Sequence, residues 1–387
     1  MLRQLFRCRS MLIDKCRPVT SGQFLQLVRS AHRWEKYEKR RAGSNSKSGF
    51  SWGRYEVSLF GLSWLVTVKD LLGYKPVHED NDPLKELVKK AWLLRRSRKY
   101  NEAVDVLHEA LAFLGTRKDE MVRSRVYDEL ANTYYEMGKL EEAEKVFRNL
   151  IHRLLELHGK HEKDPEFIGI SLKLADIFAQ KGLLDNAESG FRHCVTKQLQ
   201  VVEEHMKKFI VSRGAMVEEK FLVEAHGPAY TDPIALLGMC FESYAHFIIN
   251  YRDEERLPEV EEYMDEALKI SYQIYGPNAA HTVTLLNNIG AACIIRNRFQ
   301  LALKYLSLGV DRILNVDECA SMIPGFYCNY AEALFHCGRR EEALEYARRA
   351  VKLSRREDQR IQNYAREFLR HLEADVKKKD YKGWFNW

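Results

Sequence analysis

Residues 130–147 of this chain read LANTYYEMGKLEEAEKVF, and residues 174–191 repeat the pattern as LADIFAQKGLLDNAESGF. In the first segment Ala131 and Ala143 stand twelve residues apart, with Gly138 between them, and the second segment has the same spacing. Large apolar residues surround each alanine, and a glycine at this point is a common end to a helix. The pattern predicts two antiparallel helices that pack closely because small residues lie where they cross.

The same twelve-residue pair recurs at the positions, numbered 8 and 20, where the tetratricopeptide repeat (TPR) carries small residues. The pairs are Ala91/Ala103, Ala131/Ala143, Ala175/Ala187, Gly290/Ala302 and Ala331/Ala343. They predict an all-α fold, a TPR-like right-handed superhelical solenoid of about six helix-turn-helix repeats. A weaker repeat carries Val260, Met264 and Ala267, and a helix over about 358–378 is expected to cap the array.

The repeats are longer than usual. Successive position-20 residues are 40, 44, 73, 42 and 41 residues apart, against a usual period of about 34. The longest interval predicts an extended second helix over about 185–212 and a loop around residues 227–228. A first helix over about 234–251 would then open the fourth repeat, without a clear small residue at position 8.

Positive charge is concentrated at the start of the chain. Residues 1–50 carry a net +9, whereas the whole chain carries +6, so the remainder is slightly acidic at −3. That balance argues against nucleic acid as a partner. Arginines interleaved with apolar residues and few acids predict a mitochondrial presequence followed by a flexible connector. The alternative is a solvated basic tail that targets nothing.

Residues 57–68 form a mostly apolar run that is shorter than the roughly 20 residues a spanning helix needs. We expect this run to lie on a membrane surface or to pack on the first repeat; a span over 55–72 is the alternative. The predicted organisation is a presequence and connector (1–50), a short hydrophobic segment and linker (51–83), the TPR solenoid (84–375) and a basic, aromatic tail (376–387).

The motifs that could carry chemistry are weak. Residues 49–53 match G-x-S-x-G around Ser51, but that pattern needs a strand before it and a helix after it on a parallel sheet. His158 and His161 lack a third metal ligand nearby, and the eight cysteines include no C-x-x-C. We therefore predict no catalytic, cofactor or metal site and no small-molecule substrate, with the cysteines as buried free thiols.

The first helix of each repeat is expected to line a groove through positions 2, 5, 6, 9, 12 and 13. The candidate partner-binding residues at these positions are Arg95, Arg125, Asn132, Lys173, Asn287, Asn288, Asn329 and Glu332. Asparagine side chains can bond a peptide backbone, and charges select the partner. Asp128 stands at position 5 beside Asn132, where chaperone cofactors carry lysine, so chaperone tails are disfavoured as ligands.

Two family resemblances follow from these residues. Residues 284–290, TLLNNIG, are similar to the groove-lining helix of kinesin light chain repeats. Residues 171–175 (SLKLA), 236–240 (LLGMC) and 266–271 (EALKIS), in that order, resemble the mitochondrial tetratricopeptide repeat protein 19 family over roughly residues 84–375.

The second resemblance implies a function. That family is associated with the inner mitochondrial membrane, with building and maintaining respiratory complex III (ubiquinol–cytochrome c reductase), and with clearing fragments of its Rieske subunit. It implies a non-enzymatic scaffold whose partners are complex III subunits, with no cofactor. Two alternatives remain at this point: a cytosolic cargo adaptor of the kinesin light chain type, and an enzyme that uses Ser51.

Overall fold

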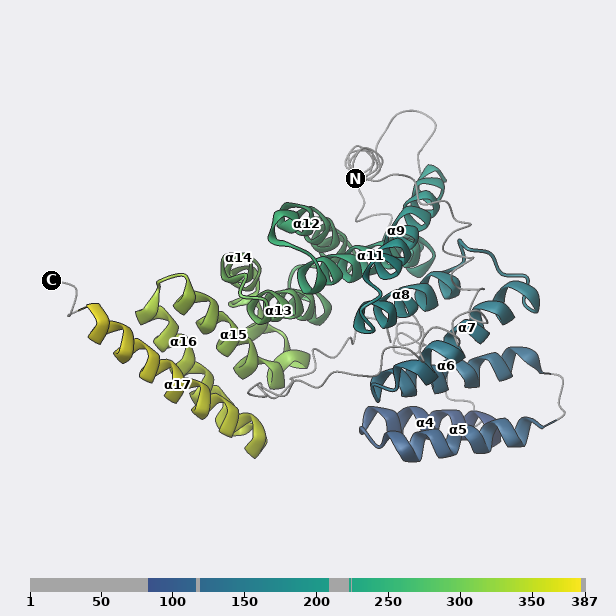
Figure 1. The fold of residues 1–387 in the computed structure, drawn as a ribbon, viewed down its shortest axis with the longest axis horizontal. Helices are drawn as coiled ribbons and strands as arrows, with labels where there is room; N and C mark the ends of the chain where they lie inside the picture. Colours follow the sequence, from purple (N-terminus) through teal and green to yellow (C-terminus); the bar gives the residue numbers. More distant parts are fainter. Residues whose placement is uncertain (1–82, 116–118, 209–222, 224, 384–387) are drawn as a thin grey trace, which may run out of the picture. The chain divides into compact units, whose positions relative to one another are not determined.

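The computed structural model describes residues 83–115, 119–208, 223 and 225–383. Every regular element in these ranges is an α-helix or a short 3-10 helix, and they contain no strand (Figure 1). The described chain forms two compact units. Ser51, the presequence and the apolar run at 57–68 lie outside the described residues. No helix of the described ranges is long and apolar enough to cross a membrane.

The first unit consists of three antiparallel helix pairs. They are α4 (Pro83–Arg96) with α5 (Tyr100–Leu114), α6 (Glu120–Glu136) with α7 (Leu140–Glu156), and α8 (Pro165–Gln180) with α9 (Leu184–Lys207). The long α9 was expected from the 73-residue interval, and it ends five residues before the predicted position 212.

The second unit consists of three further pairs and a terminal helix. They are α11 (Pro228–Tyr251) with α12 (Leu257–Ile274), α13 (Ala280–Ile295) with α14 (Phe299–Gly309), α15 (Ile323–His336) with α16 (Arg340–Leu353), and α17 (Gln359–Gly383). Short 3-10 helices η3 (Glu254–Arg256), η4 (Arg312–Asn315), η5 (Asp317–Met322) and η6 (Ser354–Arg356) connect some of them. These pairs and α17, which packs on α15 and α16, confirm the predicted TPR-like fold.

Two helix ends in the second unit differ from the sequence-based expectation. The helix α11 begins at Pro228, six residues before the predicted start, and carries Pro233 inside it. Proline suits the first helical position because no intrahelical partner exists there for an N–H group, and the internal Pro233 gives up one backbone hydrogen bond. The helix α17 continues to Gly383, past the expected end at about 378.

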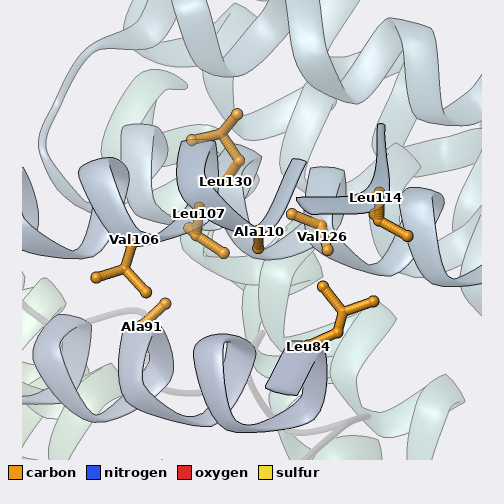
Figure 2. Close-up of a cluster of buried hydrophobic side chains, with 8 residues drawn as sticks. All are labelled: Leu84, Ala91, Val106, Leu107, Ala110, Leu114, Val126 and Leu130. Carbon is orange, nitrogen blue, oxygen red and sulfur yellow. The ribbon is translucent and has the colours of Figure 1, made fainter. Parts of the chain in front are cut away.

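Small buried residues lie at the helix crossings, as the spacing predicted. Every alanine of the five pairs is at most 1% exposed, and Gly290 is buried as well. In the first repeat Ala91 contributes to an apolar cluster that joins three helices. Figure 2 shows this cluster, made of Leu84 and Ala91 on α4, Val106, Leu107, Ala110 and Leu114 on α5, and Val126 and Leu130 on α6.

The turn inside five of the six pairs has one geometry. The backbone N–H that follows the left-handed residue donates to the carbonyl five residues earlier, for example from Lys139 to Tyr134 (2.9 Å) and from Leu183 to Phe178 (2.8 Å). This is the bond of a Schellman turn, which usually places glycine in the left-handed position. Two repeats use Arg98 (φ 58°) and Asn297 (φ 59°) there instead. The turn geometry is therefore kept even where glycine is absent.

The crossing at Gly290 gives a direct test of the packing. A methyl group built on Gly290 would lie 2.5 Å from Leu306 Cδ2, whereas one on Gly325, also in a first helix, would meet nothing within 4 Å. We expect Gly290→Ala to lower the free energy of unfolding by about 1–2 kcal/mol, because overpacking outweighs the helix propensity of alanine. Gly325→Ala, the control, should be neutral or stabilising. Urea unfolding of both variants measures this, and equal stabilities would contradict the packing account.

Candidate partner-binding face of the first helices

We define the A-helix face as the surface formed by the groove positions of the first helices, α4, α6 and α8 in the first unit and α11, α13 and α15 in the second. The eight candidate residues all lie on these helices. Their surroundings differ between the two units. In the first unit most of the candidate side chains are hydrogen-bonded to residues of a neighbouring repeat. In the second unit they keep more unused hydrogen-bond donors and acceptors.

Arg95 is a buried inter-repeat contact. Its side chain is 6% exposed and donates from Nη2 to Glu129 Oε2 (3.0 Å) and from Nη1 to Glu136 Oε1. Both acceptors lie on α6, so the guanidinium of α4 links the first repeat to the second. Burial raises the pKa of the Glu129 carboxyl, and the nearby Arg95 opposes that effect. Arg95 therefore serves cohesion between repeats, a role that its position alone did not predict.

Lys173 and Asn132 form the corresponding contact between the second and third repeats. Lys173 Nζ on α8 donates to Asn132 Oδ1 on α6 (2.6 Å) and lies 5.4 Å from the centre of the Phe147 ring. The Lys173 side chain is buried, and this burial lowers the pKa of its ammonium group. Two predicted residues are thus brought together, as partners of each other.

A second link between α6 and α8 was missed by sequence reasoning. The Tyr135 hydroxyl donates to Asp176 Oδ2, which also accepts a hydrogen bond from Gln180. Burial raises the pKa of the Asp176 carboxyl, while these two hydrogen bonds lower it. Tyr135 and Asp176 stand at positions 12 and 9 of their repeats, so the position rule alone could have identified them.

Arg125 is the exception in the first unit. It lies at position 2 on α6 and is exposed to solvent. Within the part of the chain that the structure describes, its guanidinium has no hydrogen bond or ion pair. It is therefore available to a partner, although an exposed arginine by itself indicates no particular ligand.

Asparagines dominate the A-helix face of the second unit. Asn329 Nδ2 on α15 donates to Asn287 Oδ1 on α13 (3.2 Å), and the neighbouring Asn288 is also half-buried. A carboxamide has two donor hydrogens and an acceptor oxygen, so this single bond leaves most of their capacity unused. Glu332 on α15 lies 3.1 Å from His336 Nε2, one turn further along the helix. Four of the eight predicted residues thus lie on the two neighbouring helices α13 and α15, and Asn329 and Asn287 are bonded to each other.

The fourth repeat has two further polar residues at the positions expected to line the groove, and sequence reasoning did not select them. Counting back twelve residues from Val260 places Ile248 at position 8, and both side chains are buried. Glu242 and His246 then occupy positions 2 and 6 on α11, with Oε1 and Nε2 3.9 Å apart. Burial raises the pKa of Glu242 to about 7 and lowers the pKa of His246 to about 4. Position 8 is not small here, so the twelve-residue pair of small residues that marks the other repeats is absent.

Most of the described histidines and cysteines that the sequence offered as candidates for chemistry are hydrogen-bonded or buried in the fold. His158 Nε2 lies 2.9 Å from Ser124 Oγ. Five of the six described cysteines are buried, as predicted, and burial raises the pKa of the Cys194 thiol. Within the described ranges no three His, Cys, Asp or Glu side chains are arranged to hold a metal ion. The A-helix face can therefore donate and accept hydrogen bonds, and it offers no activated nucleophile.

The Arg95 network is testable by stability. We expect Arg95→Ala to lower the free energy of unfolding by about 3–5 kcal/mol, because it leaves the Glu129 carboxylate buried without its counter-charge. Glu129→Gln in the same background should restore part of the loss. The control is Lys99→Ala, which removes an exposed ion pair to Glu102 and should cost less than about 1 kcal/mol. Urea unfolding measures the loss of stability in each variant. An equal loss in Arg95→Ala and Lys99→Ala would show that the buried Arg95–Glu129 pair stabilises the fold no more than an exposed ion pair.

Glu242 predicts a pH-dependent stability. Its folded pKa of about 7 lies above the ordinary value of 4.5, so its contribution to stability falls as pH rises through that window. The lowered pKa of His246 acts in the opposite sense, because it removes stability as pH falls from 6.5 to about 4. Unfolding curves across both windows should show Glu242→Gln gaining up to about 3 kcal/mol relative to the unsubstituted protein as pH rises. The exposed Glu255→Gln is the control; parallel curves for all three proteins would refute the assignment.

Comparison with known proteins finds tetratricopeptide repeats within this geometry. The tetratricopeptide repeat family matches residues 124–166, which cover the second repeat, and residues 324–357, which cover the last pair. Human mitochondrial tetratricopeptide repeat protein 19 is 27% identical over 290 residues, covering 74% of this chain and 71% of the human protein. The rat protein of the same name is 25% identical over 299 residues, covering 76% of each chain.

Among solved structures, BtubC (BKLC) from P. vanneervenii aligns with a TM-score of 0.42 and 18% sequence identity, covering 70% of this chain and 91% of that one. An alignment of 290 residues is longer than either unit, so the similarity to the human protein extends into both. The two matched repeats coincide with helix pairs α6–α7 and α15–α16. The chain therefore carries tetratricopeptide repeats at these two helix pairs, and it is similar over most of its length to mitochondrial tetratricopeptide repeat protein 19.

Proposed function

We propose that the protein is a non-enzymatic, protein-binding scaffold at the inner mitochondrial membrane. In this proposal it assists the assembly and maintenance of respiratory complex III, including the handling of Rieske subunit fragments. Its partners would be complex III subunits, among them the Rieske protein itself. The observation that carries the proposal is the similarity to mitochondrial tetratricopeptide repeat protein 19 over 74% of this chain.

Packing in the fourth repeat indicates that the resemblance goes beyond the general tetratricopeptide-repeat pattern. Segments 236–240 and 266–271, which carry the resemblance, lie on α11 and α12 and contact each other. A methyl group on Gly238 would lie 3.1 Å from Ile270 Cγ2. The small residue at 238 therefore allows the close approach that positions 8 and 20 provide in other repeats. The resemblance rests on a packing feature that the general repeat pattern does not contain.

A mitochondrial location is supported by two independent observations. The named relatives are mitochondrial proteins, and the first 50 residues of this chain have the composition of a presequence. How the protein would reach the inner membrane involves residues outside the described ranges. The exposed and half-buried polar groups on α13 and α15 are the surface that we propose for the partner.

The second candidate function is a cytosolic cargo adaptor of the kinesin light chain type. It is favoured by the two adjacent asparagines, Asn287 and Asn288, in the first helix α13. Such side chains can hold an extended peptide by its backbone. This alternative leaves the positive charge of residues 1–50 without a function, so we rank it second.

Affinity purification distinguishes the two. The tagged full-length protein is expressed in cells, mitochondria are gently solubilised, and the co-purifying proteins are identified by mass spectrometry. We expect complex III subunits to be enriched. The variant Asn287→Ala/Asn288→Ala/Asn329→Ala should lose most of that enrichment while remaining folded by circular dichroism, because it removes the three carboxamides of α13 and α15.

The matched control is Asn101→Ala/Asn149→Ala/Asn186→Ala, which removes three carboxamides from the second helices α5, α7 and α9. It should retain complex III subunits. Recovery of the protein outside mitochondria with motor or trafficking proteins would instead select the adaptor function. Equal retention by both triple variants would keep the scaffold and exclude these asparagines as its binding surface.

A further inference from the structure

One face of α16 is strongly basic. Arg348, Arg349, Lys352, Arg355 and Arg356 are all exposed, and no aspartate or glutamate occurs between residues 346 and 356. We call these five residues the α16 basic surface. They recur at steps of three and four, which places them on one side of the helix and of the 3-10 turn η6 that follows it.

Packing fixes the direction of this surface. Ala343, Ala347, Ala350 and Ser354 form the buried side of α16 and η6, at most 1% exposed. That side packs against α15 and α17. The basic surface therefore lies opposite the interior of the unit, on the outside of a second helix and away from the A-helix face.

Most of this charge is not neutralised within the chain. Arg348 lies 3.5 Å from Glu373 and Arg349 lies 2.5 Å from Glu345, both as exposed pairs that contribute little. Among the residues that the structure describes, the side chains of Lys352, Arg355 and Arg356 have no hydrogen bond or ion pair. Three adjacent cations therefore project into solvent without a partner.

Helix stability does not account for this arrangement. Cations near the carboxyl end of a helix interact favourably with its macrodipole, but only within the last turn. In α16 that turn contains Lys352. Arg348 and Arg349 precede it, and Arg355 and Arg356 lie beyond the end of the helix in η6. The surrounding composition does not explain it either, because the chain after residue 50 carries a net −3.

We propose that the α16 basic surface binds the headgroups of anionic phospholipids at a bilayer surface. A cluster of four to eight lysines and arginines on a helix is the arrangement that attracts anionic headgroups. Leu353, 37% exposed, lies among these cations and supplies an apolar contact for the interface.

This inference goes beyond the proposed scaffold function and does not depend on complex III. It assigns the two sides of the last repeat to different ligands. The A-helix face on α15 would be left to a protein, while the opposite side of α16 would contact lipid. The binding would be peripheral and reversible, and it would weaken with ionic strength because exposed charges are screened.

The test needs a local probe, because residues 1–50 are also basic and would attract the same vesicles. A photoreactive benzophenone amino acid is placed at position 353 of the full-length protein, replacing Leu353. The purified protein is irradiated with vesicles of phosphatidylcholine alone or of phosphatidylcholine with phosphatidylglycerol, and lipid adducts are measured by mass spectrometry. We expect adducts only with the anionic vesicles, decreasing as salt is added.

Charge removal provides the second measurement. Lys352→Gln/Arg355→Gln/Arg356→Gln should lower the adduct yield at limiting vesicle concentration by roughly 100-fold, about fivefold for each cation. The control Lys89→Gln/Lys90→Gln/Lys145→Gln removes the same charge from exposed positions in the first unit and should leave the yield unchanged.

Three results would overturn the proposal. One is equal adduct yield with neutral and anionic vesicles. Another is equal yield from a probe placed at the exposed Leu93 of the first unit, which would show that the vesicle contact is not specific to α16. The third is efficient crosslinking from position 353 to polyglutamate without crosslinking to vesicles, which would assign the surface to an acidic protein.

Discussion

Close packing at a helix crossing is the constraint on which every repeat of this protein depends. Two antiparallel helices can approach only where neither carries a large side chain, and the buried alanines at positions 8 and 20 provide that space in the first three repeats and the last. The fifth repeat uses Gly290 against Leu306. The fourth has Ile248 and Val260 at the two positions and brings its helices together at Gly238 and Ile270 instead. The two helices of the fourth repeat therefore still approach closely, but at a different point along their length.

This packing also determines what the A-helix face can do. Consecutive first helices lie close enough for a side chain on one to reach the next, as Arg95 reaches Glu129, Lys173 reaches Asn132, and Asn329 reaches Asn287. Groups that are used for cohesion between repeats have less capacity left for a partner. In the first unit the contacts between repeats involve buried charged groups, and breaking such a pair is strongly destabilising. In the second unit it involves neutral carboxamides with spare donors and acceptors.

Much of the fold could be predicted from the sequence because its signals are local. The paired small residues, the left-handed turns and the capping helix each depend on residues close in the chain. The fourth repeat gave only a weak signal in the sequence, because Ile248 stands at its position 8 and the compensating glycine at 238 lies ten residues from that position. The surroundings of Arg95 and Lys173 were also not predictable, since their partners lie 34 to 41 residues away on another repeat. Position numbers give the residues that are expected to line a groove, and they do not reveal which of them are already bonded.

The account assigns partner binding to the first helices of the second unit, and a cryo-electron microscopy map of complex III purified through a tag on this protein would test that assignment most directly. The account predicts density for the second unit on the complex, with Asn288 on α13 and Asn329 on α15 facing a complex III subunit. A map in which the second helices made the contact, or in which no density for the protein accompanied the complex, would contradict it.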